Sequence, residues 1–332
     1  MRLKLSSSID PFLIFLIGTV ALASILPCRD QGAVAFGWIT DAAIALLFFL
    51  HGAKLSREAI LAGIGHWRLH LLVAASTFIL FPALGLVVRA LGKGWIDPSL
   101  TAGVLFLCLL PSTVQSSIAF TSIARGNVPA AVCSATLSNL GGIFLTPLLV
   151  GLLMGAKAGG GVSLHSIEAI ALQLLLPFVL GHLSRPLTSG FITRHRTLVG
   201  RVDRGSILLV VYTAFSAAVV EGLWRKLSAG DIALVLALDG VLLAAALVVT
   251  TVVARTLGFS REDEIAIVFC GSKKSLASGV PMAGVLFPPA LVGPLIVPLM
   301  LFHQMQLMVC AVLARRYAAS HPIEPEGEAE PA

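Results

Sequence analysis

The sequence predicts an all-α polytopic membrane protein with ten transmembrane helices arranged as two inverted five-helix repeats. The composition is 57% hydrophobic and 12% charged, with a mean hydropathy of +0.95, which lies outside the range of soluble globular domains. Apolar runs of bilayer length recur along the whole chain. Two of these runs are interrupted by polar residues, at corresponding places in the two halves of the chain.

Ten apolar runs reach about the twenty residues that a helix needs to cross the hydrocarbon core. They cover residues 11–28, 35–53, 69–91, 99–124, 127–152, 166–184, 204–222, 230–256, 264–287 and 290–314. The segments between them are rich in Gly, Pro and charge and are predicted as turns. No small-residue cleavage site follows the basic start of the chain, so we expect an uncleaved first span. The Glu- and Pro-rich segment 321–332 is predicted to be a disordered tail.

The distribution of Lys and Arg predicts the orientation. When loops are assigned to alternate sides, most of these residues fall on the side that holds both termini. Positively charged loops stay inside, so we expect a cell (inner) membrane protein with both termini in the cytoplasm. The net charge of +6 would suggest an acidic partner in a soluble protein. In a membrane protein, the distribution of Lys and Arg between the two sides indicates the orientation instead. Nucleic acid is not indicated.

The two halves of the chain, residues 11–152 and 166–316, hold five runs each. Because five is odd, the second half starts from the opposite side of the membrane, which is the condition for inverted repeats. Polar residues interrupt the fourth run at 110–117 and the ninth run at 271–275. Matching interruptions predict a binding site near the bilayer midplane of a transporter. The alternative is that Pro111 only kinks a packed helix whose hydroxyl groups bond to their own backbone.

The ninth run carries two adjacent lysines, Lys273 and Lys274, at its middle. A lysine near the bilayer centre costs about 2.5–3.5 kcal/mol on insertion scales, so both must face protein, water or a ligand. Ser272, Ser275 and the neighbouring glycines are poor helix formers, which predicts two half-helices that meet at an unwound centre. A loop between two short hairpin helices is the alternative, although the flanking runs are too short for two crossings.

Other polar residues inside the runs are further candidates for the site. We expect Asp239, a buried acid that is costly unless paired, to pair or exchange a proton with one of the two lysines; an interfacial position is the alternative. His303, Gln304 and Gln306 are expected to hydrogen-bond between helices. The remaining candidates for substrate or ion contacts, beside Lys273 and Lys274, are Thr113, Gln115, Ser116, Ser117, Ser138, Asn139, Ser272 and Ser275.

The sequence contains no motif for hydrolysis, nucleotide binding or metal binding, so we expect neither an enzyme nor a cofactor. Its five cysteines are scattered, without metal-ligand spacing, and are predicted to be small buried hydrophobic residues. The expected partners are therefore the lipid bilayer and a small solute.

Four sequence runs resemble a known family. The run Ala124-Arg-Gly-Asn-Val128, followed by Leu145-Thr-Pro147, is similar to the bile acid:sodium symporter family. Leu47-Phe-Phe-Leu-His-Gly-Ala-Lys54 and Gly271-Ser-Lys-Lys-Ser275 resemble its divergent cotransporter-seven branch, of the bacterial type. The resemblance covers essentially the whole chain. It implies a panel of spans one, two, six and seven, and a core of spans three to five and eight to ten, in which broken spans four and nine cross.

The resemblance also shows a departure in span nine. In sodium-coupled members a Glu and a Gln coordinate sodium, and these positions are Val268 and Ser272 here. The next two family positions, Asn and Ser, are Lys273 and Lys274. A hard cation needs several oxygen ligands and is repelled by ammonium groups, so we expect the sodium sites not to be intact.

The expected function is a secondary transporter that moves a small organic anion by alternating access. A lysine of span nine would replace sodium or relay a proton, so the coupling ion is H⁺ or Na⁺. We expect one lysine to face the cavity and favour Lys273. The alternatives are a sodium-coupled symporter with residual sodium sites, and a membrane regulator of ion homeostasis with little transport.

Overall fold

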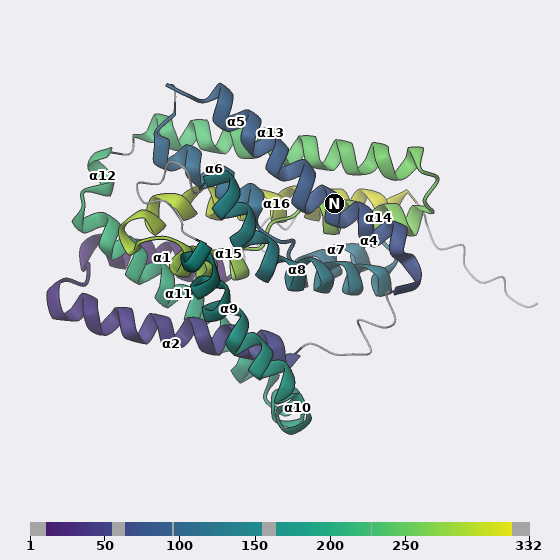
Figure 1. The fold of residues 1–332 in the computed structure, drawn as a ribbon. Helices are drawn as coiled ribbons and strands as arrows, with labels where there is room; N and C mark the ends of the chain where they lie inside the picture. Colours follow the sequence, from purple (N-terminus) through teal and green to yellow (C-terminus); the bar gives the residue numbers. More distant parts are fainter. Residues whose placement is uncertain (1–10, 55–63, 95, 155–163, 227, 321–332) are drawn as a thin grey trace, which may run out of the picture.

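The computed structural model describes residues 11–54, 64–94, 96–154, 164–226 and 228–320, and Figure 1 shows their arrangement. Within these ranges the chain is helical apart from short connections, and no strand occurs. The predicted all-α fold is therefore confirmed. The predicted disordered tail, 321–332, lies outside the described residues.

The helices follow one another as α1 (Pro11–Ile25), α2 (Asp30–Lys54), η2 (Ile64–His66), α4 (Trp67–Ala75), η3 (Ser76–Leu80), α5 (Phe81–Leu91), α6 (Pro98–Leu109), α7 (Gln115–Ile123), α8 (Val128–Met154), α9 (Leu164–Leu183), α10 (Arg185–Arg194), α11 (Arg196–Val220), α12 (Leu223–Lys226), α13 (Ala229–Thr256), α14 (Arg261–Gly271), α15 (Leu276–Leu286) and α16 (Pro289–Ala319). The short element η3 is a π-helical turn that joins α4 to α5 without a break in the helix.

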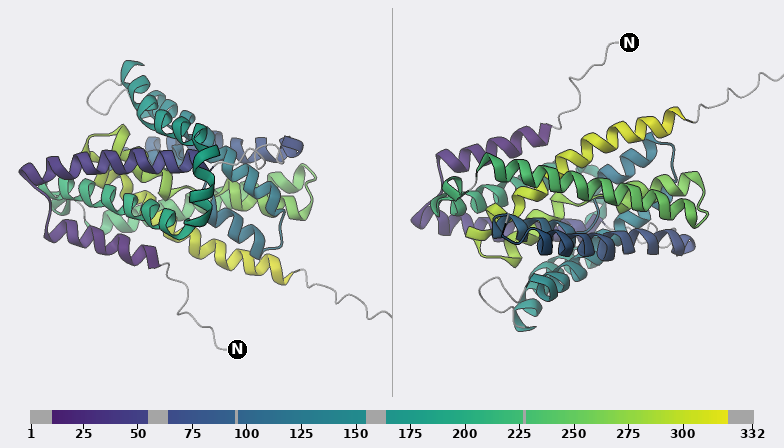
Figure 2. Two further views of the ribbon diagram at one scale, coloured as in Figure 1. Left: turned by 90° about the horizontal axis from the view of Figure 1, so that it is seen from below. Right: turned by 90° about the horizontal axis from the view of Figure 1, so that it is seen from above.

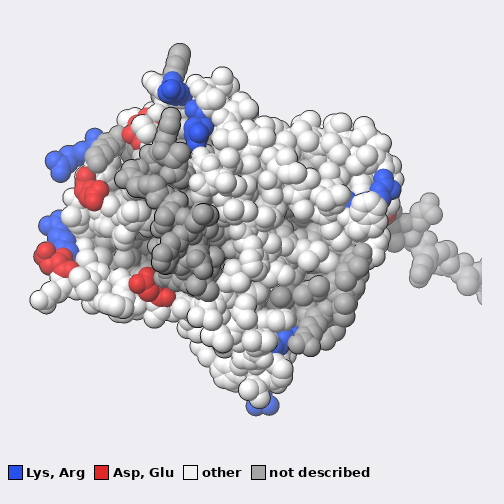
Figure 3. Space-filling view, viewed as in Figure 1, with Lys and Arg blue, Asp and Glu red and all other residues white. Residues whose placement is uncertain are grey.

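Six helices are long and apolar enough to cross a membrane, by length and composition, within the part of the chain that the structure describes. They are α2, the continuous rod from α4 to α5, α8, α11, α13 and α16. Large apolar side chains such as Trp38, Leu71 and Val241 are more than half exposed. In Figure 3 the visible charged residues gather toward the ends of the molecule, and a broad face between them carries almost none. This surface is that of an integral membrane protein.

Both predicted interruptions are present as breaks between helices. The first break separates α6 from α7 at residues 110–114, where Leu110 is extended (φ −80°, ψ 155°) and Pro111 has no N–H to continue the helix. The second break, residues 272–275, separates α14 from α15. At its end the Ser275 side chain caps α15 by accepting a hydrogen bond from the Ser278 N–H at 3.1 Å.

The two breaks lie against each other. The Ser275 N–H donates to the Pro111 carbonyl at 2.9 Å, and the Ser112 hydroxyl donates to the Cys270 carbonyl at 2.5 Å. Unwound backbone inside a membrane needs such partners, because no water is there to replace the lost helical hydrogen bonds. The two breaks therefore satisfy part of each other's hydrogen bonding.

Helices α1, α2, α9 and α11 pack together along one side of the molecule (Figures 1 and 2). Glycines allow α2 and α9 to approach closely where they cross. A Cβ atom on Gly52 would lie 1.9 Å from the Phe178 carbonyl oxygen, and one on Gly181 would lie 1.9 Å from the Phe49 carbonyl oxygen. Only hydrogen fits at both positions, as is usual where membrane helices touch backbone to backbone.

The other helices, α4 to α8 and α13 to α16, form the larger part of the molecule around the two breaks. Helix α16 packs against α6, α13 and α15, and α11 joins the two groups of helices by packing on α15 and α16. One hydrophobic cluster runs through both groups and includes Phe48 of α2, Phe106 of α6 and Phe215 of α11.

The segment between the sixth and seventh apolar runs differs from the prediction of a turn. It forms helix α10 and the first two turns of α11, which begins at Arg196 rather than at 204. The residues there are mostly polar, so a search for apolar runs excluded them. Polar residues can extend a membrane helix where they face a cavity or leave the bilayer, and the polar start of α11 lines a cavity.

Candidate functional site

A cavity of about 520 Å³ lies where the two breaks face α1, α2 and α11. The breaks and the helix ends beside them contribute Thr113, Val114, Gln115, Ser116, Ser275, Leu276, Ala277 and Ser278. Helix α8 contributes Asn139, and α16 contributes His303 and Leu307. The cavity is thus walled on one side by the crossing of the two broken helices.

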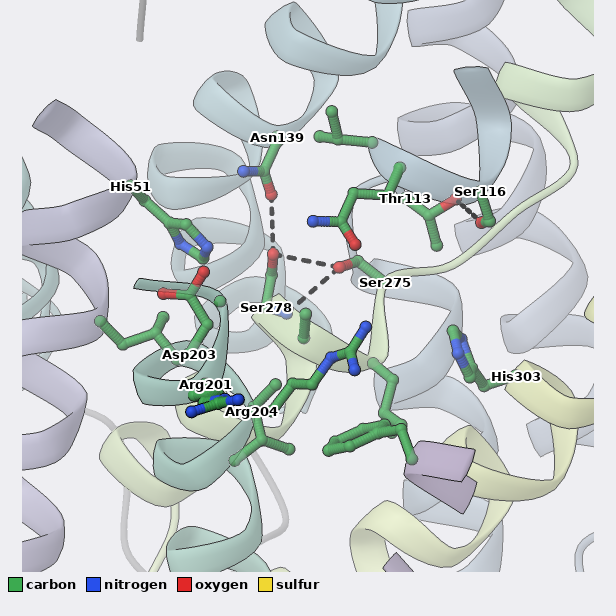
Figure 4. A pocket seen from close by; sticks show the side chains of 18 of the residues that line it. His51, Thr113, Ser116, Asn139, Arg201, Asp203, Arg204, Ser275, Ser278 and His303 are labelled. Atoms are coloured by element: carbon green, nitrogen blue, oxygen red, sulfur yellow. Dashed lines mark hydrogen bonds between the residues drawn. The ribbon is translucent and has the colours of Figure 1, made fainter. Parts of the chain in front are cut away.

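Hydrogen bonds fix the polar groups of this wall (Figure 4). The Ser278 hydroxyl donates to the Asn139 side-chain oxygen at 2.7 Å and accepts from the Ser275 hydroxyl at 3.1 Å. On the other break, the Thr113 and Ser116 hydroxyl oxygens are 2.7 Å apart. These groups keep unused donor or acceptor capacity, so the wall can accept and donate hydrogen bonds to a solute.

The opposite wall is positively charged. Arg196, Arg201 and Arg204 of α11 line the cavity, and Figure 4 shows Arg201 and Arg204 reaching toward it from the same helix. Asp203 also lines it, but its carboxylate forms an ion pair with Lys54 of α2. Because Lys54 compensates the one acid, the arginines leave the lining with an excess of positive charge.

A second cavity of about 330 Å³ adjoins the first. It shares Gln115, Arg196, Gly200 and Asp203 with the larger cavity and adds Lys54 and Arg185. The two cavities together extend from the crossing of the breaks to the ends of α2, α10 and α11. Both linings hold three Lys or Arg residues and Asp203 as the one acid, so the whole path is basic.

Five of the predicted site residues line the larger cavity: Thr113, Gln115, Ser116, Asn139 and Ser275. Three other predicted residues hold the breaks in shape. Ser138 accepts a hydrogen bond from the Ser112 N–H at 3.1 Å, the Ser117 hydroxyl oxygen lies 2.9 Å from that of Thr113, and the Ser272 hydroxyl donates to the Val268 carbonyl at 2.6 Å. Their hydroxyl groups support the wall from behind.

Neither lysine of the second break lines the cavity, and both are fully buried. The Lys273 ammonium donates to the Ser116 carbonyl at 3.0 Å and lies 3.8 Å from the centre of the Phe120 ring. The expectation that Lys273 faces the cavity is therefore wrong in this conformation. Its ammonium group sits behind the wall, where it holds the start of α7.

Lys274 points the other way. Its ammonium donates to three backbone carbonyls, those of Thr77 at 2.9 Å, Cys108 at 3.0 Å and Leu110 at 2.7 Å. The segment between α14 and α15 is not helical, and the two ammonium groups leave it toward different partners, Lys273 toward α7 and Lys274 toward η3 and the end of α6. The two lysines consequently contact different helices instead of sharing one site.

Asp239 of α13 does not form the expected ion pair. It is fully buried, and neither carboxylate oxygen has a hydrogen-bond partner among the described residues. Lys274 has already used its three donors on nearer carbonyls, and Lys273 lies against aromatic rings. The proposed exchange of a proton with a lysine finds no direct contact here.

Gln306 of α16 confirms the expected hydrogen bonding between helices. Its side-chain oxygen accepts from the Lys274 N–H at 2.9 Å, and its side-chain nitrogen donates to the Lys274 carbonyl at 2.9 Å. His303, one turn earlier, lines the cavity. The last helix therefore binds the backbone of the second break.

Sequence reasoning missed the arginine wall and His51, which also lines the cavity. Arg196 and Arg201 lie in a segment that was predicted as a turn, and Arg204 was counted only as a charge at the start of the seventh run. A usable signal was present: Arg201 and Arg204 are three residues apart, and this spacing puts both on one face of a helix that runs into the seventh apolar run.

Apolar helices, two broken helices in contact and a polar cavity at their crossing define a membrane transporter. Comparison with known proteins makes this more specific. The sequence profile of the SBF-like CPA transporter family matches residues 10–319, so the chain belongs to this family. The family is one of transporters, and the protein is accordingly a transporter and not an enzyme.

The relatives agree with this assignment. An uncharacterized protein of Pseudomonas aeruginosa is 61% identical over 309 residues, which cover 93% of each chain. The "Putative symporter YfeH" of Escherichia coli strain K12 is 58% identical over 315 residues and 95% of each chain. The zebrafish (Danio rerio) sodium/bile acid cotransporter 7 is 26% identical over 309 residues, 90% of this chain and 91% of its own. The resemblance to bile acid:sodium symporters is confirmed.

Proposed function

We propose that the protein is a secondary transporter of the cell (inner) membrane that carries a small organic anion by alternating access. The observation that carries this proposal is the cavity at the crossing of the two breaks, with hydroxyl and amide groups on one wall and Arg201 and Arg204 on the other. A guanidinium group binds a carboxylate through two parallel hydrogen bonds, which suits an anionic solute. The breaks supply the groups that orient the rest of the molecule.

In this proposal the chain has ten spans in two inverted repeats, 11–152 and 166–316, with both termini in the cytoplasm. Helices α1, α2, α9 and α11 form a panel, and the remaining spans form a core. The cavity takes its lining from both groups, so a rotation of one against the other would open it to either side of the membrane. The adjoining cavity leads toward Lys54 and Arg185, the side that the charge distribution assigns to the cytoplasm.

Transport does not require sodium in this proposal. The two buried lysines place fixed positive charge at the second break and donate hydrogen bonds to carbonyls of α4 to α7 and the first break. A free cation at the same place would be repelled by both ammonium groups. A lysine thus takes the place of the coupling ion.

The test is uptake into liposomes that contain the purified protein, with a panel of labelled small carboxylates and their methyl esters. Uptake of at least one carboxylate should exceed that of its uncharged ester. Arg201→Gln and Arg204→Gln should each lower it at least tenfold, because each removes a charged hydrogen bond of roughly 1.5–3 kcal/mol. Arg194→Gln is the matched control, since Arg194 of α10 lines neither cavity.

Uptake should be unchanged when sodium is replaced by N-methyl-D-glucamine. Strict dependence of uptake on sodium would refute the proposal that a lysine takes the place of the coupling ion. Carboxylate uptake that is unchanged by both arginine substitutions would refute the proposed role of Arg201 and Arg204 in binding. If no anion is taken up, the proposed function fails.

A further inference from the structure

The most unusual polar group outside the cavity is the Lys274 ammonium, which is enclosed with no solvent contact. Its three N–H donors meet three backbone carbonyl oxygens at 2.7–3.0 Å, and the Phe81 ring closes the site with its centre 4.2 Å from the nitrogen. Three donors and three acceptors saturate the ammonium group. The oxygens come from separate parts of the chain, α4 to α5 and the end of α6.

Each of these carbonyls lacks its usual backbone N–H donor because of a local feature of the sequence. In an α-helix the Phe81 N–H would bond to the Thr77 carbonyl, but in the π-helical turn it bonds to Ser76 instead. The next residue, Pro82, has no N–H to donate. The Thr77 carbonyl oxygen is therefore free to accept from Lys274.

The other two carbonyls belong to the first break. The Cys108 carbonyl would accept from the N–H of Ser112 if α6 continued, but that N–H donates to the Ser138 hydroxyl. Leu110 lies beyond the end of α6, so its carbonyl points into the break. Converging carbonyl oxygens without backbone donors are the ligands that a cation takes in a protein interior.

We propose that this carbonyl cage, formed by Thr77, Cys108 and Leu110, is a binding site for a monovalent cation and that Lys274 is its tethered occupant. Removal of the side chain would leave three buried carbonyl oxygens unpaired. An unpaired buried acceptor is unfavourable, so a free cation of suitable size would bind in place of the ammonium. Lysine thereby makes the protein independent of a free cation at this position.

Lys273 provides a matched comparison in the same break. Its ammonium has one carbonyl partner, that of Ser116, and otherwise lies over the faces of Phe120 and Phe269. A single carbonyl and two rings do not form an oxygen cage. Loss of the Lys273 side chain should destabilise the protein without creating a cation site.

The experiment measures thermal unfolding of detergent-solubilised Lys274→Ala, Lys273→Ala and unmodified protein. The salts are sodium, ethylammonium and N-methyl-D-glucamine chloride at one ionic strength. Lys274→Ala should unfold several degrees lower than the unmodified protein in N-methyl-D-glucamine, and its midpoint should rise saturably with ethylammonium or sodium. The other two proteins should not distinguish the salts. Ethylammonium alone would indicate a site for primary amines, and both ions a general monovalent site.

Lys274→Asn, which keeps a short donor and leaves space beside it, should show the same dependence and serves where Lys274→Ala yields no folded protein. A folded variant with no response to either ion, or failure of both variants to fold in every salt, overturns the proposal. The proposal rests on the proposed function, because it gives a structural reason why transport does not require sodium. The unfolding measurement needs no substrate and is therefore independent of the uptake assay. A missing uptake signal would therefore leave the unfolding result in place.

Discussion

Substitution of Gly52 by alanine should disrupt the packing of α2 against α9. The added Cβ would lie 1.9 Å from the Phe178 carbonyl oxygen and 2.9 Å from the His182 nitrogen, and neither backbone atom can rotate away. Overpacked cores lose about 1–3 kcal/mol, and contact with rigid backbone places this substitution at the upper end, roughly 3 kcal/mol. With an unfolding entropy of about 2.1 cal/mol/K per residue, a chain of 332 residues loses about 1.4 °C per kcal/mol, so the unfolding midpoint should fall by roughly 4 °C.

The assay is the fraction of monodisperse protein after heating, measured by size-exclusion chromatography in detergent. Gly37→Ala, in the same helix, is the matched control because a Cβ there would meet no atom within 4 Å. Alanine is a better helix former than glycine by about 1 kcal/mol, so this variant should be equally or more stable. Equal midpoints for the two variants would refute the close backbone contact between α2 and α9.

Three further predictions concern other parts of the chain. Asp239→Asn should not destabilise the protein, because the carboxylate is buried without a partner; a midpoint drop of more than about 4 °C would reveal an interaction absent here. In a background without native cysteines, Ser189→Cys should react with an impermeant thiol reagent from the cytoplasmic side only, and labelling from outside would contradict the proposed orientation. Glu264→Gln should cost about 1–3 kcal/mol, since Glu264 accepts two hydrogen bonds from Arg255 at 2.9 Å and one from Tyr317 at 2.7 Å; an unchanged unfolding midpoint would show that this cluster adds no stability.

The two breaks were predictable because residues that disfavour a continuous lipid-facing helix occur at both places. Pro111 cannot donate to a helix, and two lysines within an apolar run exclude an ordinary lipid-facing span. Which side chain faces the cavity was not predictable. The directions of Lys273 and Lys274 depend on which carbonyls lack a backbone donor. The Thr77 carbonyl lacks one because a π-helical turn is followed by Pro82.

The charged wall of the cavity was missed for a different reason. Hydropathy identifies residues that contact lipid, whereas Arg201 and Arg204 face a polar cavity at the end of α11. The seventh apolar run therefore begins only at residue 204, whereas α11 and its cavity-lining residues begin at Arg196. For Asp239, the sequence correctly predicts an acid whose burial is unfavourable. It does not show that Lys273 and Lys274 already donate to backbone carbonyls, so the expected ion pair is absent.

The contact between Gln306 and Lys274 has a consequence for the choice of residue at 306. A side-chain amide is chemically a peptide group, so Gln306 gives the unwound backbone both halves of the pair of bonds that a neighbouring β-strand would give. Glutamate has the same length but lacks the donor, and leucine lacks both groups. Helix α16 therefore satisfies both backbone groups of Lys274, so this residue can stay outside a helix without leaving its N–H and carbonyl unpaired.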